Sequence, residues 1–195
     1  MRLLATFFLL SCACTRPAVR PTEIIEAAAL KATRCGDVTA LWTGKPPDGP
    51  GPLWSFIDTL KFRLADGSER KFAPAGNIEP PHTAFELFSP DCSTVALAQD
   101  SYGPYHLVPT AELGAYLEGK RAPIVVKPPA ASTAQILTEQ HWVSPTRFEF
   151  FASCCGGVEV FQVDVSAPEK ATRVYFAAEA PSGIRRTATG YEVIR

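Results

Sequence analysis

The chain has 195 residues, enough for one domain with a substantial core or at most two small ones. Its 46% hydrophobic and 20% charged residues are close to globular averages, which excludes a chain that is disordered throughout. The 19 basic and 20 acidic side chains are spread without long runs, so nothing gathers phosphates and nucleic acid is not an expected partner. The 18 prolines favour strands and loops over long helices.

The N-terminus has the layout of a secretory signal. Arg2 supplies a positive charge, residues 3–10 are mostly apolar, and small side chains follow at Ser11 and Ala13. The apolar stretch is too short to span a bilayer. We therefore expect residues 1–11 to be a cleaved signal peptide, with a buried core helix as the alternative.

The tetrapeptide Leu9-Leu10-Ser11-Cys12 resembles the lipobox of bacterial lipoproteins, in which the cysteine becomes the lipidated first residue of the mature chain. By that resemblance Cys12 carries a lipid anchor in the membrane, and Ala13 implies an outer-membrane or cell-surface destination. A periplasmic or secreted protein is the alternative, and Cys14 competes as the cleavage site. Residues 12–20 are then a proline-rich tether, followed by a single mostly-β domain over residues 21–195.

The domain is predicted to begin with a helix over residues 22–34. Thr22 would be its cap, acidic side chains lie in its first turns and basic ones in its last, and Gly36 would end it. The apolar stripe of this helix would be Ile25, Ala28, Ala29 and Ala32.

The rest of the chain predicts an antiparallel sheet meander with one further short helix, a mainly β (α+β) fold. The pair Asp66-Gly67 is a strong hairpin signal. Thr110 as cap and Gly119 as stop bound a short helix over residues 110–118. The expected strands are rich in aromatic and branched residues: 38–43, 61–65, 68–72, 84–88, 94–99, 105–108, 122–126, 148–152, 158–165, 173–177 and 191–194. Loops are expected over residues 44–52, at Pro80-Pro81 and around Pro128-Pro129.

Residues 88–97 carry Ser89-Pro90-Asp91 before an apolar strand. They resemble the start of a blade in the propeller repeats of TolB-type and WD40-like proteins, where Ser-Pro-Asp-Gly opens a turn. Cys92 stands in the glycine place, and a poorer copy over residues 142–151 has Thr146 where the family has Asp. The resemblance implies an alternative fold, a partial β-propeller-like blade stack, since a closed propeller needs at least four blades.

Four cysteines lie outside the signal and the tether: Cys35, Cys92, Cys154 and Cys155. In an oxidising compartment an even number predicts disulfides, with three possible connectivities. Because a bond between neighbours is strained, we expect one of Cys154 and Cys155 to join Cys35 and the other to join Cys92. Alternatively, the vicinal pair is a thiol or metal sensor, although zinc and redox motifs usually separate the two sulfurs by two residues.

The histidines His82, His106 and His141 lack metal-binding spacing, so we expect no metal site and no cofactor. The segment from Asp100 to His106 combines tyrosines, a carboxylate and an imidazole. Asp100 and His106 are therefore the candidate catalytic residues of an exported hydrolase. The plainer alternative is a turn whose tyrosines, Tyr102 and Tyr105, cover the sheet edge.

Two further groups of side chains have alternative interpretations. The carboxylates that could pair for glycosidase chemistry are Asp91, Asp100, Glu149 and Glu159. The tryptophans Trp42, Trp54 and Trp142 could line a groove, but core packing is the favoured interpretation.

The hypothesis that follows is an exported, lipid-anchored envelope protein that acts as a non-enzymatic binding or scaffold module. Its partner would be an envelope protein or a glycan. The two alternatives are the exported hydrolase at Asp100 and His106 and the sensor at Cys154 and Cys155.

Overall fold

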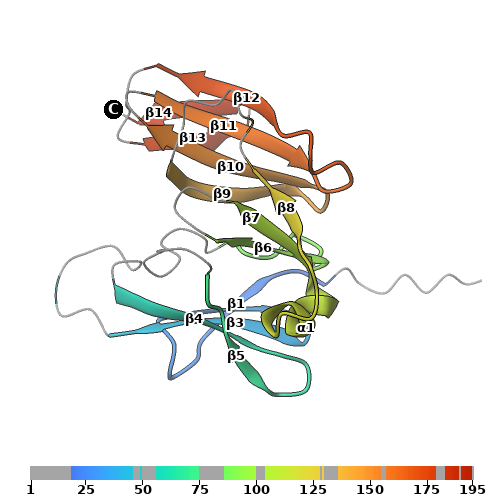
Figure 1. The fold of residues 1–195 in the computed structure, drawn as a ribbon. Coiled ribbons are helices and arrows are strands. Elements are labelled where there is room, and N and C mark those ends of the chain that lie inside the picture. Colours follow the sequence, from blue (N-terminus) through green and yellow to red (C-terminus); the bar gives the residue numbers. More distant parts are fainter. Residues whose placement is uncertain are drawn as a thin grey trace, which may run out of the picture.

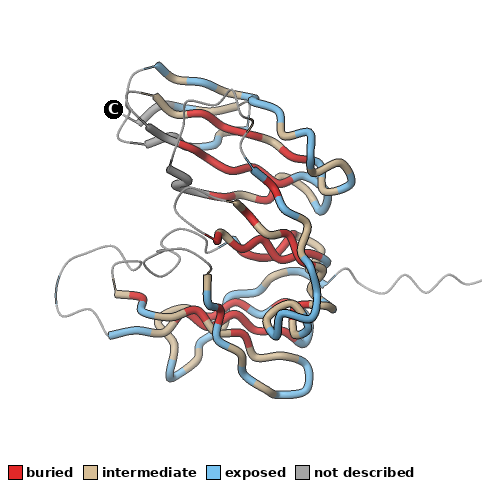
Figure 2. Tube along the Cα trace, in the orientation of Figure 1, coloured by how far each residue is buried: buried red, intermediate tan, exposed pale blue. Residues whose placement is uncertain are grey.

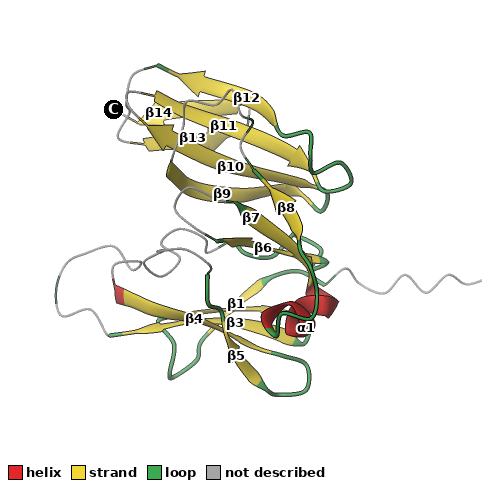
Figure 3. Cartoon of the chain, in the orientation of Figure 1, coloured by secondary structure: helices red, strands yellow, loops and turns green. Residues whose placement is uncertain are grey.

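The computed structural model describes residues 19–45, 49, 56–74, 86–99, 104–127, 129, 136–154, 157–178, 183–188 and 190–194. Its strands form four antiparallel sheets, each built from strands in sequence order (Figure 1). The predicted mainly β fold is confirmed, with one short helix beside the sheets (Figure 3).

The first sheet contains β1 (Thr22–Ile24), β2 (Lys31–Cys35), β3 (Val38–Gly44), β4 (Ile57–Arg63) and β5 (Glu69–Lys71). The second contains β6 (Thr94–Ala98), β7 (Tyr105–Pro109) and β8 (Ile124–Val126). The third contains β9 (Ile136–Ser144), β10 (Arg147–Cys154), β11 (Gly157–Asp164) and β12 (Thr172–Ala177). The fourth is the hairpin of β13 (Gly183–Thr187) and β14 (Gly190–Ile194).

The second sheet is the middle layer of the molecule, and most side chains of β6 and β7 are buried, on both faces of the sheet (Figure 2). In β6, Val95 and Leu97 pack into a first core with the first sheet, whereas Ala96 packs into a second core with the third sheet. Successive side chains of a strand point to opposite faces, so a strand between two layers must be apolar throughout. That requirement explains the uninterrupted apolar run in β6.

The first core joins the first sheet, the second sheet and the helix α1 (Leu113–Leu117). Trp42, Leu60 and Phe62 are its largest fully buried side chains from the first sheet, and Leu113 anchors α1 against them. The second core is aromatic, with the ring of Tyr105 lying 5.1 Å from that of Phe148. The stacked layers are therefore held by continuous apolar contact.

The fourth sheet covers the outer side of the third. The ring of Tyr191 in β14 lies 5.2 Å from that of Tyr175 in β12 and 6.2 Å from that of Phe151 in β10. The carboxylate of Glu149 is buried on the same side of the third sheet, and the residue is 1% exposed. Its Oε1 accepts a hydrogen bond from Nε2 of Gln162 at 2.8 Å. The C-terminal hairpin thus docks through aromatic contact and one polar group.

The predicted helix over residues 22–34 is wrong. The segment forms β1, a loop and β2, and Ile25, expected on the buried stripe, is fully exposed. The physical reason is pairing: β2 completes a ladder with β3, which buries Ala32, Thr33 and Cys35. Helix propensity is weak against such tertiary contact.

The other elements mostly follow their predictions. The Asp66-Gly67 hairpin is confirmed, with Gly67 at φ 78°. The helix predicted over residues 110–118 is shorter, because a 3₁₀ turn (Thr110–Glu112) precedes α1. Thr110 does not cap it, although Gly119 ends it at φ 72°. The prediction omitted β9 and β13 entirely.

Several predicted features lie partly or wholly outside the described residues. The signal peptide over residues 1–11, the lipidation site Cys12 and most of the tether over residues 12–20 are among them. The others in the fold are residues 84 and 85 of an expected strand, most of the loop over residues 44–52, the pair Pro80-Pro81, and Pro128. Of that strand, Phe88 makes an isolated bridge to Val95. The blade-stack alternative stays a prediction: the sheets are meanders, as blades are, and this is compatible with either fold.

The expected cysteine pairing is wrong. Cys35 bonds to Cys92, with 5.4 Å between their Cα atoms, and so links the end of β2 to the turn before β6. The reason is the layer contact between the first and second sheets, which brings these two cysteines together at the edge of the first core.

Candidate functional site

A surface pocket of about 540 Å³ lies where the first, second and third sheets meet the entering chain. Its lining is mainly apolar, with Trp142 and Phe88 as the aromatic side chains. The other residues that line it are Arg20, Pro21, Thr33, Glu86, Pro90, Asp91 and Pro145. Arg20 is the last residue of the predicted tether, so the pocket lies beside the point where the domain begins.

Both Ser-Pro motifs identified in the sequence contribute to this pocket, through Pro90 and Pro145. In the first turn, Oδ1 of Asp91 accepts hydrogen bonds from Oγ of Ser89 at 2.7 Å and from Oγ of Ser93 at 2.8 Å. Burial acts to raise the pKa of Asp91, but these bonds lower it overall. The carboxylate is therefore ionised and occupied in forming the turn.

Glu86 is the more accessible acid of the pocket, with 56% of its side chain exposed. Its Oε2 lies 3.1 Å from Nδ1 of His141 and accepts a longer hydrogen bond, 3.4 Å, from the backbone N–H of Trp142. The hydrogen bond with His141 is the main cause that lowers the pKa of Glu86. Sequence reasoning did not select Glu86, because its partner His141 lies 55 residues away in β9.

Trp142 is held by the core as well as lining the pocket. It is 9% exposed, and its Nε1 donates to the carbonyl of Leu87 at 3.2 Å. The expectation that the tryptophans are core residues is confirmed for Trp42 and Trp142, while Trp54 lies outside the described residues. Trp142 adds a rigid aromatic wall to the pocket.

The catalytic candidate His106 is separate from this pocket. Its Nδ1 lies 2.8 Å from the hydroxyl of Tyr116 in α1, and Gln99 donates to that same hydroxyl at 3.0 Å. Burial lowers the pKa of His106 and raises that of Tyr116. A neutral imidazole held by a phenol is a packed polar contact, and Tyr116 is a partner that sequence reasoning missed.

The structure describes one member of the proposed catalytic pair, His106. Asp100 and Tyr102 lie outside the described residues, so their part of the candidate site stays a prediction. Tyr105, expected at a sheet edge or in a ligand site, is 1% exposed and packs in the second core.

The candidate glycosidase carboxylates do not pair where they are described. Glu149 and Glu159 are each 1% exposed, but the strand register places them on opposite faces of the third sheet. Glu149 faces the C-terminal hairpin and lies 3.4 Å from Arg186, whereas Glu159 lies 2.7 Å from Arg173. Each has a cation beside it, as buried carboxylates generally do.

Cys154 is the last residue of β10, and Cys155 lies outside the described residues, so the sensor alternative stays a prediction. His82 also lies outside the described residues. Within the described part of the chain, no three His, Cys, Asp or Glu side chains gather in a way that could hold a metal ion. Nor does any helix in that part have the length and apolar character to cross a bilayer.

Comparisons with protein-family models, with curated proteins and with solved structures found no match for this chain. The site itself is therefore the basis for a proposal about function.

Proposed function

We propose that the protein is a lipid-anchored envelope protein and a non-enzymatic binding module, and that the pocket beside its tether binds a segment of another envelope protein. The observation that carries the proposal is the pocket of about 540 Å³ with its aromatic and proline lining. Concave, mainly apolar sites with a few polar groups are the usual form of binding sites.

The lining favours a peptide over a sugar. Trp142, Phe88 and three prolines offer flat apolar surface, which suits apolar side chains of an extended segment. Asp91 is occupied within its own turn and Glu86 is shared with His141, which leaves Arg20 and Thr33 as the polar side chains of the lining that could bind hydroxyls. The carboxylate of Glu86 would favour a basic residue in the bound segment.

A binding role also agrees with the chemistry of the lining. The pocket carboxylates already have hydrogen-bond partners that keep them ionised, and the pKa of each is lowered, which is unfavourable for a general acid near neutral pH. Of the two residues proposed for the hydrolase alternative, His106 is the one that the structure describes. Its Nδ1 atom already contacts the hydroxyl of Tyr116.

The test is site-specific photocrosslinking in the protein's own host. A photoreactive amino acid at position 145, in the pocket, should give one dominant protein adduct, and glycan adducts would assign the pocket to a sugar instead. The matched control is position 168, a proline that follows β11 and lines a different pocket. The substitution Pro145→Arg should abolish the adduct formed from a second pocket position, Pro90, whereas Pro168→Arg should not.

The same adduct from positions 145 and 168 would refute a specific site. The anchoring half of the proposal is tested separately, by the mass of the mature N-terminus and by membrane release on Cys12→Ser. A soluble, unlipidated native protein would refute the anchor without affecting the crosslinking result.

A further inference from the structure

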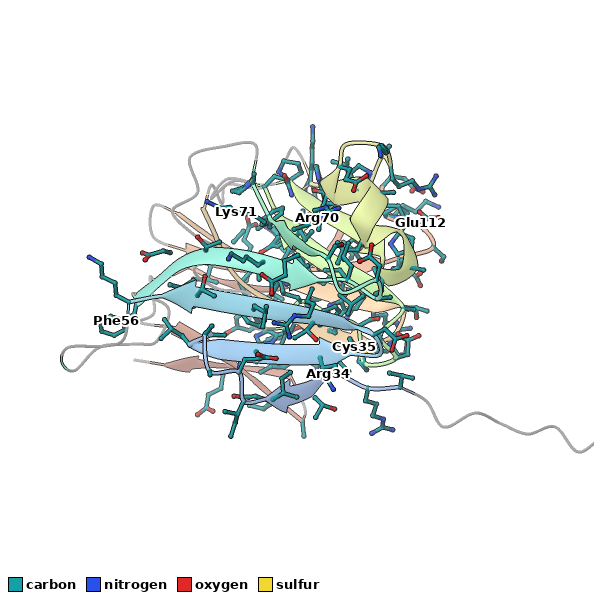
Figure 4. All side chains as sticks on the ribbon, turned by 90° about the horizontal axis from the view of Figure 1, so that it is seen from below. Arg34, Cys35, Phe56, Arg70, Lys71 and Glu112 are labelled. Carbon is teal, nitrogen blue, oxygen red and sulfur yellow. A yellow bond between two sulfur atoms is a disulfide. The ribbon has the colours of Figure 1, made fainter. Side chains whose placement is uncertain are left out.

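The outer face of the first sheet carries an excess of positive charge. In this sheet the inward side chains include Cys35, Trp42 and Phe62, so the alternate residues of each strand face outward. The register places Arg34, Lys61, Arg63 and Lys71 at outward positions around the buried Thr39 and Leu41. Figure 4, seen from below, labels Arg34 and Lys71. The register of β4 and β5 also places the acidic side chain of Glu69 on this face.

The acidic groups at this face are bound to a single cation. Arg63 lies 2.8 Å from Glu26 and 3.1 Å from Glu69. Lys61 and Lys71 are directly opposite each other in the β4–β5 ladder. Like charges placed opposite each other repel, so the pair would gain from an anion bound above it.

An exposed apolar side chain lies on the same side of the sheet. The connection between β1 and β2 passes beneath the sheet in Figure 1, and its Glu26 reaches Arg63 from there. Ile25, the residue before Glu26, is fully exposed at 101%. An exposed isoleucine beside a basic surface is the combination found where proteins lie on membranes.

The chain enters the domain through this sheet. Thr22 of β1 pairs with Arg34, so the edge strand that follows the tether borders the basic surface. Residues 12–20 cannot span more than about 30 Å, since an extended chain covers at most about 3.5 Å per residue. A lipid on Cys12 would therefore hold the first sheet close to the bilayer.

We infer that the outer face of the first sheet docks on an anionic lipid bilayer, with Arg34, Lys61 and Lys71 against phosphate headgroups and Ile25 at the headgroup boundary. The inference rests on the proposed anchoring and adds to it the orientation of the domain. The choice of lipid follows from charge complementarity, because the chain as a whole has a net charge of −1 while this face is positive.

The experiment uses the full mature chain with Cys12→Ser, so that membrane binding by the outer face of the first sheet is measured without a contribution from the lipid anchor. Co-sedimentation with phosphatidylglycerol vesicles should show binding that salt weakens, and phosphatidylcholine vesicles should show little. The variant Lys61→Glu/Lys71→Glu should weaken binding at least tenfold, as each lysine near an anionic surface contributes about a fivefold change. Ile25→Ser should weaken it on its own.

The matched control is Lys127→Glu/Lys170→Glu, which changes the same charge at two exposed lysines away from the first sheet. Equal binding by the two charge-reversed variants, or equal binding to the two lipids, would overturn the inference. An unlipidated native protein would refute the proposed lipid anchor but not the docking face, because the vesicle measurement is made on protein without the lipid. Unfolding midpoints of all variants show that a loss of binding is not a loss of fold.

Discussion

At the scale of single residues, Cys92 has the most unusual backbone. Its φ is 62°, and it is the one non-glycine residue with positive φ in the described part of the chain. L-residues pay a steric cost in this conformation, which glycine does not. The disulfide to Cys35 therefore holds a strained position in the turn before β6.

The first prediction compares two ways of removing that disulfide. Losing a link across 57 residues should cost about 4 kcal/mol under the chain-entropy model. Cys35→Ala/Cys92→Gly should recover about 1 kcal/mol relative to Cys35→Ala/Cys92→Ala, because glycine accepts the positive φ. Urea unfolding of both variants beside the reduced wild-type protein measures the difference, and identical stabilities would show that the turn relaxes once the link is gone.

The conformation at Cys92 was partly predictable from sequence, whereas its partner was not. The blade-like motif placed Cys92 where related turns have glycine, and the observed φ agrees with that place. The identity of its disulfide partner depends on which sheets pack against each other. Cys35 lies 57 residues earlier, and only the contact between two separate sheets brings it near.

At the scale of elements, short-range signals are reliable where they specify a turn and misleading where they specify only a periodicity. Asp66-Gly67 predicted its hairpin correctly. The charges and alanines of residues 22–34 predict a helix, although Gly36-Asp37 after them is also a two-residue hairpin signal and Gly36 has φ 61°. Pairing with β3 then decides the outcome, and the charge and alanine pattern of residues 22–34 does not contain that information.

The docking of the C-terminal hairpin supplies an element-scale prediction. Burial and the adjacent carboxylate of Glu149 raise the pKa of Tyr191. Because the folded state raises this pKa, the contribution to stability is complete below the ordinary tyrosine value near 10 and is lost as the pH rises above it. Wild-type protein should therefore lose more stability than Tyr191→Phe between about pH 9 and pH 11.

Urea unfolding across that pH range measures the effect, with Tyr175→Phe as the control from the same aromatic cluster. At about pH 8 the Tyr191→Phe variant should be about 1 kcal/mol less stable, since it loses the interaction of the phenol with the carboxylate of Glu149. Parallel pH curves for wild type and Tyr191→Phe would show that the hairpin does not depend on this contact.

At the scale of the whole molecule, the second sheet couples the stability of the first sheet to that of the third, because it contributes side chains to both cores. Leu97 packs toward the first sheet and Leu107 toward the third, and both belong to the same three-stranded sheet. The apolar run of β6 indicated a buried strand, but its two-sided burial follows only from the stacking. The sheets are therefore expected to unfold as one cooperative unit.

Core truncations on the two faces of the middle sheet test that expectation. Leu97→Ala and Leu107→Ala should each cost about 2–5 kcal/mol, because each removes most of a fully buried side chain and leaves a cavity. Hydrogen exchange, read at β3 in the first sheet and β10 in the third, should show both strands opening at the same denaturant concentration in each variant. If Leu107→Ala released β10 while β3 stayed protected, the first sheet would be an independent folding unit, and the chain would contain two domains sharing one interface.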